Sequence, residues 1–158
     1  MPDDGGEDEG AAGAGGIPRE VLAALEEEMA VRSQLRRARA RELAHLLHPR
    51  LDPTAVPLIG VLGASGALRP SDLVRALHLD ASTVSRQITA VERLGLVTRV
   101  PDPTDARARL VDLTAQAREQ FTAYRDEQLD HWEHSFRGWS ADDVQQLTRL
   151  LRRLREGR

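Results

Sequence analysis

Near the middle of the chain lies a group of polar side chains, one of them an arginine, at positions suited to contact nucleic-acid bases. They are Ser82, Thr83, Ser85, Arg86 and Gln87. Apolar residues recur between and after them at steps of three and four: Val84, Ile88, Val91 and Leu94. A helix here has one apolar face and a polar remainder. Hydroxyl groups near a helix start can bind phosphates or base edges, while Arg and Gln can read guanine and adenine. The pattern predicts a recognition helix for the DNA major groove.

Two of these residues have alternative roles. Ser82 could cap the helix instead of contacting DNA, or do both. Arg86 could form a surface salt bridge.

A second, shorter helix is expected to position this face. Pro70–Leu77 is predicted to be a compact helix with Leu73 and Leu77 directed inward, and the turn His78–Ala81 follows it. Two short helices joined by such a turn form a helix-turn-helix. Another short helix is expected over Val56–Leu62, ended by the glycines of Gly63–Gly66. Pro57 lacks a backbone N–H, which leaves the start of that helix open.

A β-hairpin is predicted directly after the recognition helix, so that the stretch Asp80–Leu113 reads as a helix that could enter a DNA groove followed by a two-stranded wing. Gly95 supplies the left-handed stop that commonly ends helices. Two β-rich runs, Leu96–Val100 and Leu110–Leu113, flank a loop rich in Pro, Asp and Arg. This loop is too long for a two-residue turn.

Long amphipathic helices are predicted at both ends of the chain. The first covers about residues 18–48, with Leu22 and Leu25 on its apolar stripe, and spans about 45 Å, more than a small domain needs for its own core. Thr114 is a plausible N-cap for a second, reaching about Phe136. Ser140 and Asp143 resemble a capping box for the last. The stripe of the last helix has coiled-coil-like spacing: Val144, Leu147, Leu151 and Leu154.

Composition narrows the function classes. The chain has 158 residues and a net charge of −3, but five acids fall in the first sixteen residues, where no base occurs. The remainder has 22 basic residues, all Arg, against 20 acids. No apolar run approaches the roughly 18 residues of a membrane span and no signal pattern begins the chain, so we expect a cytoplasmic protein that contacts no membrane. Residues 1–16 are expected to be a disordered acidic tail.

Catalysis and metal binding find little support. Cysteine is absent, and the sequence shows neither a glycine-rich phosphate loop nor a nucleophile-His-acid arrangement, so we expect no enzyme and no cofactor. His45 with His48, and His131 with His134, have the i, i+3 spacing of helix metal ligands. Without a third ligand placed by the sequence, a solvated or interface face is the better interpretation, and we predict no metal site.

Taken together, the motifs resemble those of the multiple antibiotic resistance regulator (MarR) family of bacterial transcription factors. The resemblance covers about residues 18–156. The matching segments are Pro70–Leu73, Ser82–Arg86, Glu92–Val97, Asp102–Arg107 and Val111–Thr114. It implies a mostly α fold with a small β-hairpin wing, a winged helix-turn-helix that dimerises through its N- and C-terminal helices. Independently of it, both ends carry apolar stripes larger than a lone domain requires.

The resemblance also implies roles for the wing. Arg107 resembles the wing arginine that enters the minor groove, and Asp105 would hold the wing in shape; a solvated hairpin tip is the alternative. The usual Asp-Arg-Arg pattern is here Asp105-Ala106-Arg107, so one basic side chain is missing, and Arg109 would partly compensate. His78 stands where such turns commonly have Gly, and we expect it in a strained left-handed conformation. Arg69, Arg75 and Arg99 are interpreted as ordinary surface residues, with phosphate contacts as the alternative.

These observations predict a sequence-specific DNA-binding regulator, a repressor released by a small-molecule effector. Its partners would be a palindromic operator in double-stranded DNA and a second copy of the chain, and the family resemblance implies a small aromatic or phenolic effector, although the sequence marks no pocket for it. Tyr124, Trp132 and Trp139 are expected in the dimer core rather than in a ligand cage. The expected organisation is a tail at 1–16, a dimerisation helix at 17–50, the DNA-binding lobe at 51–113 and dimerisation helices at 114–158. The alternative is a winged-helix module that binds DNA or protein constitutively, without an effector.

Overall fold

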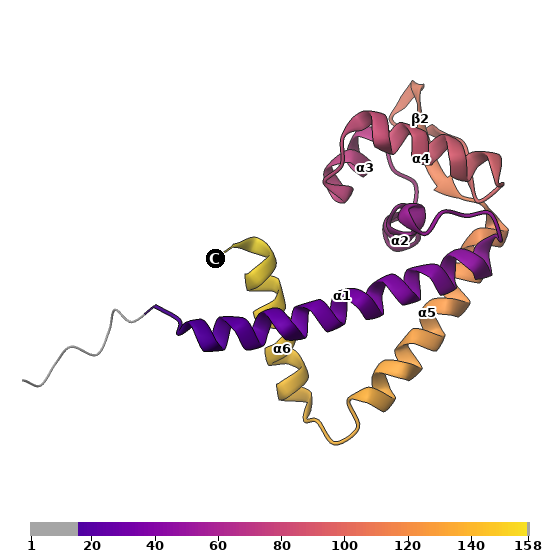
Figure 1. Cartoon of the computed structure of the whole chain (residues 1–158). Coiled ribbons are helices and arrows are strands. Elements are labelled where there is room, and N and C mark those ends of the chain that lie inside the picture. Colours follow the sequence, from indigo (N-terminus) through magenta and orange to yellow (C-terminus); the bar gives the residue numbers. More distant parts are fainter. Residues whose placement is uncertain (1–15, 158) are drawn as a thin grey trace, which may run out of the picture. The chain divides into compact units, whose positions relative to one another are not determined.

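The computed structural model describes residues 16–157, apart from the side chain of Ala106. The predicted acidic tail, except for Gly16, lies outside this range. The described chain is mostly helical with one antiparallel hairpin, as predicted (Figure 1). In chain order its elements are α1 (Arg19–Leu47), the 3-10 turn η1 (Pro53–Ala55), α2 (Val56–Ser65), α3 (Pro70–Leu77), α4 (Ala81–Arg93), β1 (Val97–Asp102), β2 (Asp105–Leu113), α5 (Ala115–Ser135) and α6 (Ala141–Glu156). None of the described helices is long and apolar enough to cross a membrane.

The chain divides into two compact units, residues 1–39 and residues 40–158. The described part of the first unit is mainly the N-terminal part of α1. Several of its apolar side chains are exposed, namely those of Val21, Leu22, Leu25, Val31 and Leu35. The predicted long helix is confirmed. The N-terminal part of its apolar stripe is exposed to solvent in the single chain, whereas Leu43 and Leu47 near its C-terminal end are buried in the core.

The second unit contains the hydrophobic core. Helix α2 packs against α3, β2 and α5, and its Leu58, Ile59 and Leu62 are fully buried. Leu73 of α3 and the predicted apolar stripe of α4 join them. The hairpin adds Val97, Val111 and Leu113, and α5 adds Ala117 and Phe121. This core joins the helix-turn-helix, the hairpin and the start of α5.

Helix α2 is longer than predicted. It begins at Val56 with Pro57 in its first turn, where a missing N–H costs nothing, and it continues through Gly63 to Ser65. Gly66 ends it with φ 77°. The predicted end at Leu62 is wrong because Gly63 lies inside the helix, where the ring of Phe121 packs against it.

The helix-turn-helix is confirmed, with one correction at its second helix. His78 adopts the expected left-handed conformation (φ 52°, ψ 38°) after α3, and α4 begins at Ala81. The N-cap of α4 is Asp80, whose side chain accepts a hydrogen bond from the N–H of Thr83. Ser82 does not cap the helix, because it is already its second residue.

The hairpin also differs from prediction. Its strands pair from Val97 with Leu113 out to Asp102 with Asp105, so the tip is a two-residue turn and the predicted long loop is wrong. The register shifts between Pro101, which pairs with Arg109, and Asp102. Extra residues in β2 at this point form a β-bulge or a similar irregularity of the pairing. Sequence spacing alone could not separate a bulge from a longer loop.

The C-terminal helices begin where their caps were predicted. Thr114 caps α5, and Ser140 with Asp143 forms a complete capping box for α6. Between the helices, Gly138 has φ 91° and the ring of Phe136 lies between those of Trp132 and Trp139. No residue of α6 is buried within the described chain.

Candidate nucleic-acid interface

Asp80 organises the start of α4. Its carboxylate accepts hydrogen bonds from the hydroxyl of Ser82 (2.5 Å) and from the backbone N–H and hydroxyl of Thr83 (2.8 and 2.7 Å). These donors, first the Ser82 hydroxyl and then the groups of Thr83, hold the pKa of Asp80 well below its ordinary value. The hydroxyl protons of Ser82 and Thr83 are thereby directed toward Asp80. Either side chain must release that bond before it can donate to a phosphate.

The remaining polar residues of α4 differ in their exposure and in their hydrogen-bond partners. Ser85 and Arg86 are exposed, and Arg86 Nη2 donates to Thr83 Oγ1 (3.1 Å). The ion pairs found among the described residues do not include Arg86. Gln87 is half-buried, and its Nε2 donates to the carbonyl oxygen of Thr54 in η1 (3.1 Å). Gln87 thus ties α4 to the lobe, while Ser85 and Arg86 stay available to a ligand.

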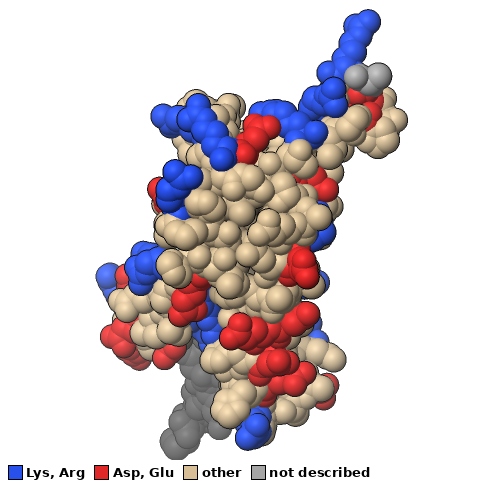
Figure 2. Space-filling model, turned by 90° about the vertical axis from the view of Figure 1, so that its right-hand side faces the viewer, with Lys and Arg blue, Asp and Glu red and all other residues tan. Residues whose placement is uncertain are grey.

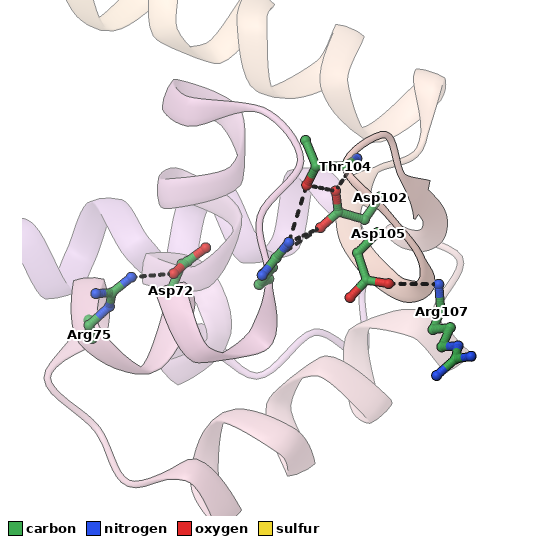
Figure 3. A network of polar contacts seen from close by, with 7 residues as sticks. Asp72, Arg75, Asp102, Thr104, Asp105 and Arg107 are labelled. Atoms are coloured by element: carbon green, nitrogen blue, oxygen red, sulfur yellow. Dashed lines mark hydrogen bonds and ion pairs between the residues drawn. The ribbon is translucent and has the colours of Figure 1, made fainter.

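The wing presents two exposed arginines. The backbone N–H of Arg107 donates to Asp105 Oδ1 (3.0 Å), and the Arg107 side chain extends away from that contact (Figure 3). Arg109 is exposed opposite Pro101 on β2. Asp105 therefore shapes the backbone from which Arg107 projects. On the face shown in Figure 2, arginines gather at the upper end, which carries the wing.

A buried carboxylate at the wing tip was not anticipated. Asp102, which ends β1, is only 6% exposed. Its Oδ1 accepts hydrogen bonds from the N–H and hydroxyl of Thr104 (2.8 and 2.7 Å), and its Oδ2 accepts one from Arg69 Nε (2.8 Å). The hydroxyl and N–H of Thr104, followed by Arg69, lower the pKa of Asp102 to about 2, although burial opposes this shift. Arg69 is therefore not an ordinary surface arginine.

Comparison with known proteins adds to this geometry. The sequence model of the MarR family matches residues 51–108, which span the lobe from Leu51 to the wing. Over 104 residues the chain is 30% identical to YxaD of Bacillus subtilis (strain 168), an uncharacterized HTH-type transcriptional regulator; the match covers 66% of this chain and 73% of that protein. This chain belongs to the MarR family.

Further similar proteins support the assignment of this chain to the MarR family. YdgJ of Bacillus subtilis (strain 168), also an uncharacterized HTH-type transcriptional regulator, is 28% identical over 105 residues, which is 66% of this chain and 64% of that protein. A MarR family structure from Bacillus stearothermophilus has TM-score 0.69 at 20% identity, over 90% of this chain and 98% of that chain. A putative MarR family transcriptional regulator from Listeria monocytogenes, complexed with 26mer DNA, has TM-score 0.67 at 16% identity, over 83% and 86%. The structures share the fold, and the curated relatives are regulators of transcription, not enzymes.

The sequence analysis did not anticipate the contacts among Asp102, Thr104 and Arg69, and only one of these contacts has a local sequence signal. Asp102 and Thr104 have the spacing of a local turn in which an Asp side chain binds the backbone two residues on, so the sequence contained that signal. Arg69 lies 33 residues from Asp102, and no local pattern links them. The other two arginines interpreted as surface residues form exposed ion pairs: Arg75 with Asp72 (Figure 3) and Arg99 with Glu92.

The MarR protein has a groove outside this interface, and its histidine pairs form no metal cluster. An open groove of about 510 Å³ runs along the turn between α5 and α6, lined by Trp139, Leu147 and Leu150 among others.

Among the described residues, no group of three or more His, Asp or Glu is placed to hold a metal ion. His48 Nδ1 instead accepts the backbone N–H of Arg50 (3.1 Å).

Proposed function

We propose that this MarR protein is a homodimeric, sequence-specific DNA-binding repressor in the cytoplasm that is released from its operator by a small aromatic or phenolic effector. The observation that carries the DNA-binding part is the exposure of Ser85 and Arg86 on α4 together with Arg107 and Arg109 on the adjoining wing. A helix with exposed polar side chains can enter the major groove of a duplex while an adjoining arginine-bearing hairpin contacts the neighbouring minor groove. The Listeria monocytogenes relative complexed with 26mer DNA supports this reading.

Each element has a distinct part in DNA binding. Helix α4 enters the major groove, where Arg86 reads a guanine edge and Ser85 contacts a phosphate or base. Ser82 and Thr83 lie at the start of α4 and add contacts once they turn from Asp80. Gln87 is the weakest member of the predicted set because it is bound to Thr54. Arg107 extends into the minor groove, and Arg109 neutralises a phosphate.

The dimer is proposed from apolar surface that the single chain leaves uncovered. Leu22 and Leu25 of α1 are 47% and 43% exposed, and Leu151 and Leu154 of α6 are 45% and 58% exposed. Val144 and Leu147 are half-buried on the same stripe of α6. Large exposed apolar patches mark association surfaces. Two copies related by a two-fold axis would present their α4 helices to half-sites about 34 Å apart on a palindrome.

Effector release follows from the same dimer geometry. An effector that binds better to a dimer whose lobes are wrongly spaced shifts the population away from DNA. In a repressor released in this way, the effector-free dimer holds its two α4 helices at the spacing that fits the two half-sites of the operator. Family membership supports this part of the proposal.

A selection experiment tests the proposal. Purified protein is used to select binding sites from random duplexes, and the winning site is titrated at several salt concentrations. We expect a palindrome with two half-sites and an affinity that falls as salt rises, because phosphate contacts release counterions. Selection of no sequence would contradict DNA recognition.

A second measurement separates an effector-responsive repressor from a constitutive module. A panel of phenolic and aromatic acids is added to the protein–DNA complex, and release is followed by fluorescence anisotropy. Release by a member of the panel supports the repressor. Retention with every compound favours the constitutive module.

A further inference from the structure

One carboxylate joins the wing tip to the start of α3. Asp102 Oδ1 is bound by Thr104, and Asp102 Oδ2 is bound by Arg69 through Nε (2.8 Å) and Nη2 (2.6 Å). Arg69 Nη2 also lies 3.3 Å from Thr104 Oγ1, to which it donates. The side chains of Arg69, Asp102 and Thr104, which come from two distant segments, therefore each bind the other two (Figure 3).

Arg69 occupies a position where another residue type would serve the helix better. It is the N-cap of α3, with extended backbone (φ −68°, ψ 147°), but its side chain makes no capping hydrogen bond. The N-caps Asp80, Thr114 and Ser140 all bind the backbone of their own helices. A short Asp, Ser or Thr is favoured at such positions. Arginine gives up local capping and gains the reach and the planar fork needed to bind Asp102 and Thr104 together.

The base and the tip of the hairpin are held by different means. At the base, Leu68 and Val111 exchange two backbone hydrogen bonds (3.0 and 2.8 Å), and Val97 and Leu113 are buried in the core. At the tip, in the described part of the chain, the side-chain bonds from Arg69 are those that join residues 102–105 to the helix-turn-helix. Loss of Arg69 should therefore free the tip and leave the base in place.

We propose that Arg69 is a positioning residue that fixes the wing tip, and with it Arg107, relative to α3 and α4. The link continues through the two-residue turn to Asp105, whose carboxylate accepts the backbone N–H of Arg107. This inference rests on the proposed function because it takes Arg107 as a DNA contact. Arg69 pre-orders the wing arginine before DNA arrives, so less conformational freedom is lost on binding.

The Asp102→Asn substitution gives a test with an unexpected sign. It removes a negative charge beside DNA, which by charge alone raises DNA affinity. It also removes the ion pair with Arg69 while an amide oxygen can still accept from Thr104. The proposal predicts a severalfold loss of operator affinity. Unchanged or higher affinity, in a variant that keeps its secondary structure, would contradict it.

A double-mutant cycle gives the second test. Arg107→Ala should lower operator affinity about tenfold in the wild-type background and less than about twofold in an Arg69→Ala background, because the untethered wing no longer presents Arg107. Arg75→Ala is the matched control, since Arg75 pairs with Asp72 on α3 and not with the wing. The cycle of Arg75 with Arg107 should be additive. Additivity in the Arg69 cycle would show that Arg69 acts alone, and it would overturn the proposal.

A readout without DNA separates this inference from the proposed function. In amide hydrogen exchange, Arg69→Ala should speed exchange at Thr104 and Arg107, whose N–H groups bind Asp102 and Asp105, and leave Leu68 and Val111 protected. Equal protection at the tip in wild type and variant would overturn the positioning role. If the wild type selects no DNA sequence while the tip exchanges as expected, the proposed function fails and the tether stands. The Arg69→Lys variant keeps the charge but lacks the planar guanidinium fork. Its exchange rates at Thr104 and Arg107 should fall between those of the wild type and those of Arg69→Ala.

Discussion

The ring of Phe121 in α5 lies directly against the backbone of Gly63 in α2. A methyl group at position 63 would stand 2.1 Å from Phe121 Cε1 and 2.3 Å from Cδ1. The contact is closer than any side chain permits, so glycine is required there although alanine is the better helix former. It joins the helix that follows the wing to the central helix of the lobe.

Gly63→Ala should therefore destabilise the protein. We expect the free energy of unfolding to fall by about 1–3 kcal/mol, because the ring of Phe121 must move within a packed core. Gly60→Ala is the matched control in the same helix, since a methyl group there meets nothing within 4 Å. That variant should gain up to about 1 kcal/mol from helix propensity. Urea unfolding of both variants measures the difference, and equal effects would contradict the packing role.

Gly63 also shows which part of the fold could not be predicted from the sequence. Helix caps and turns are local, so Thr114, the capping box at Ser140 and the left-handed His78 were all predictable from a few neighbouring residues. The end of α2 was not, because glycine reads as a helix stop unless the distant partner that needs its small size is known. That partner is Phe121, far along the chain.

His78→Gly should stabilise the protein. His78 is the sole described residue other than glycine with a positive φ, at 52°. A side chain in this region costs about 1–2 kcal/mol, while glycine loses about 0.5–1 kcal/mol of additional backbone entropy on folding. We expect a net gain of up to about 1 kcal/mol in thermal or urea unfolding. His78→Val, which is branched at Cβ, should lower stability, and a less stable His78→Gly variant would show that the imidazole makes a compensating contact.

Acid should weaken the tether at Asp102. The folded-state pKa of Asp102 is about 2, below the ordinary value of 3.8, through the groups of Thr104 and then Arg69. The unfolded chain therefore binds more protons in this range, and the stabilisation is present above the unfolded pKa and lost as pH falls toward about 2. The difference in unfolding free energy between wild type and Asp102→Asn should shrink as pH is lowered from about 5 to about 2. A difference that is constant with pH would contradict the charged state of Asp102.

For the candidate site, the sequence identified which residues carry polar groups but not which of those groups are free. Ser82 and Thr83 have the right types and spacing, yet their hydroxyls bind Asp80. Gln87 binds Thr54, 33 residues away. Helical periodicity tells which face a side chain occupies but not which partner it binds. The partner of Gln87 depends on how distant segments pack, whereas Asp80 lies only two and three residues before Ser82 and Thr83 and is a local N-cap. Arg86 and Arg107 are therefore the sharper candidates.

Arg86→Ala should relax sequence preference. Arg86 is exposed on α4, and its contact with Thr83 leaves other guanidinium donors for a base edge. Loss of a base contact costs about 1–3 kcal/mol at one position of the site, whereas loss of a phosphate contact weakens binding to all sequences alike. Site selection with wild type and variant distinguishes these outcomes. The Arg125→Ala variant, which removes an exposed arginine of α5, serves as the control, and an identical selected motif for Arg86→Ala would exclude base readout by Arg86.

Leu151→Asp should separate the two copies of the proposed dimer. Leu151 is 45% exposed, and no residue of α6 is buried within the described chain, so an aspartate there costs the single chain little. In a dimer the same carboxylate would enter an apolar seam without a partner, which is costly. Gln145→Asp is the matched control, because Gln145 is exposed and helical spacing puts it on the face opposite the stripe. Sedimentation should show monomers for Leu151→Asp and dimers for Gln145→Asp, with helical content unchanged in both. A dimeric Leu151→Asp variant would move the interface away from α6, and a monomeric wild type would remove the basis for pairing two α4 helices with two half-sites.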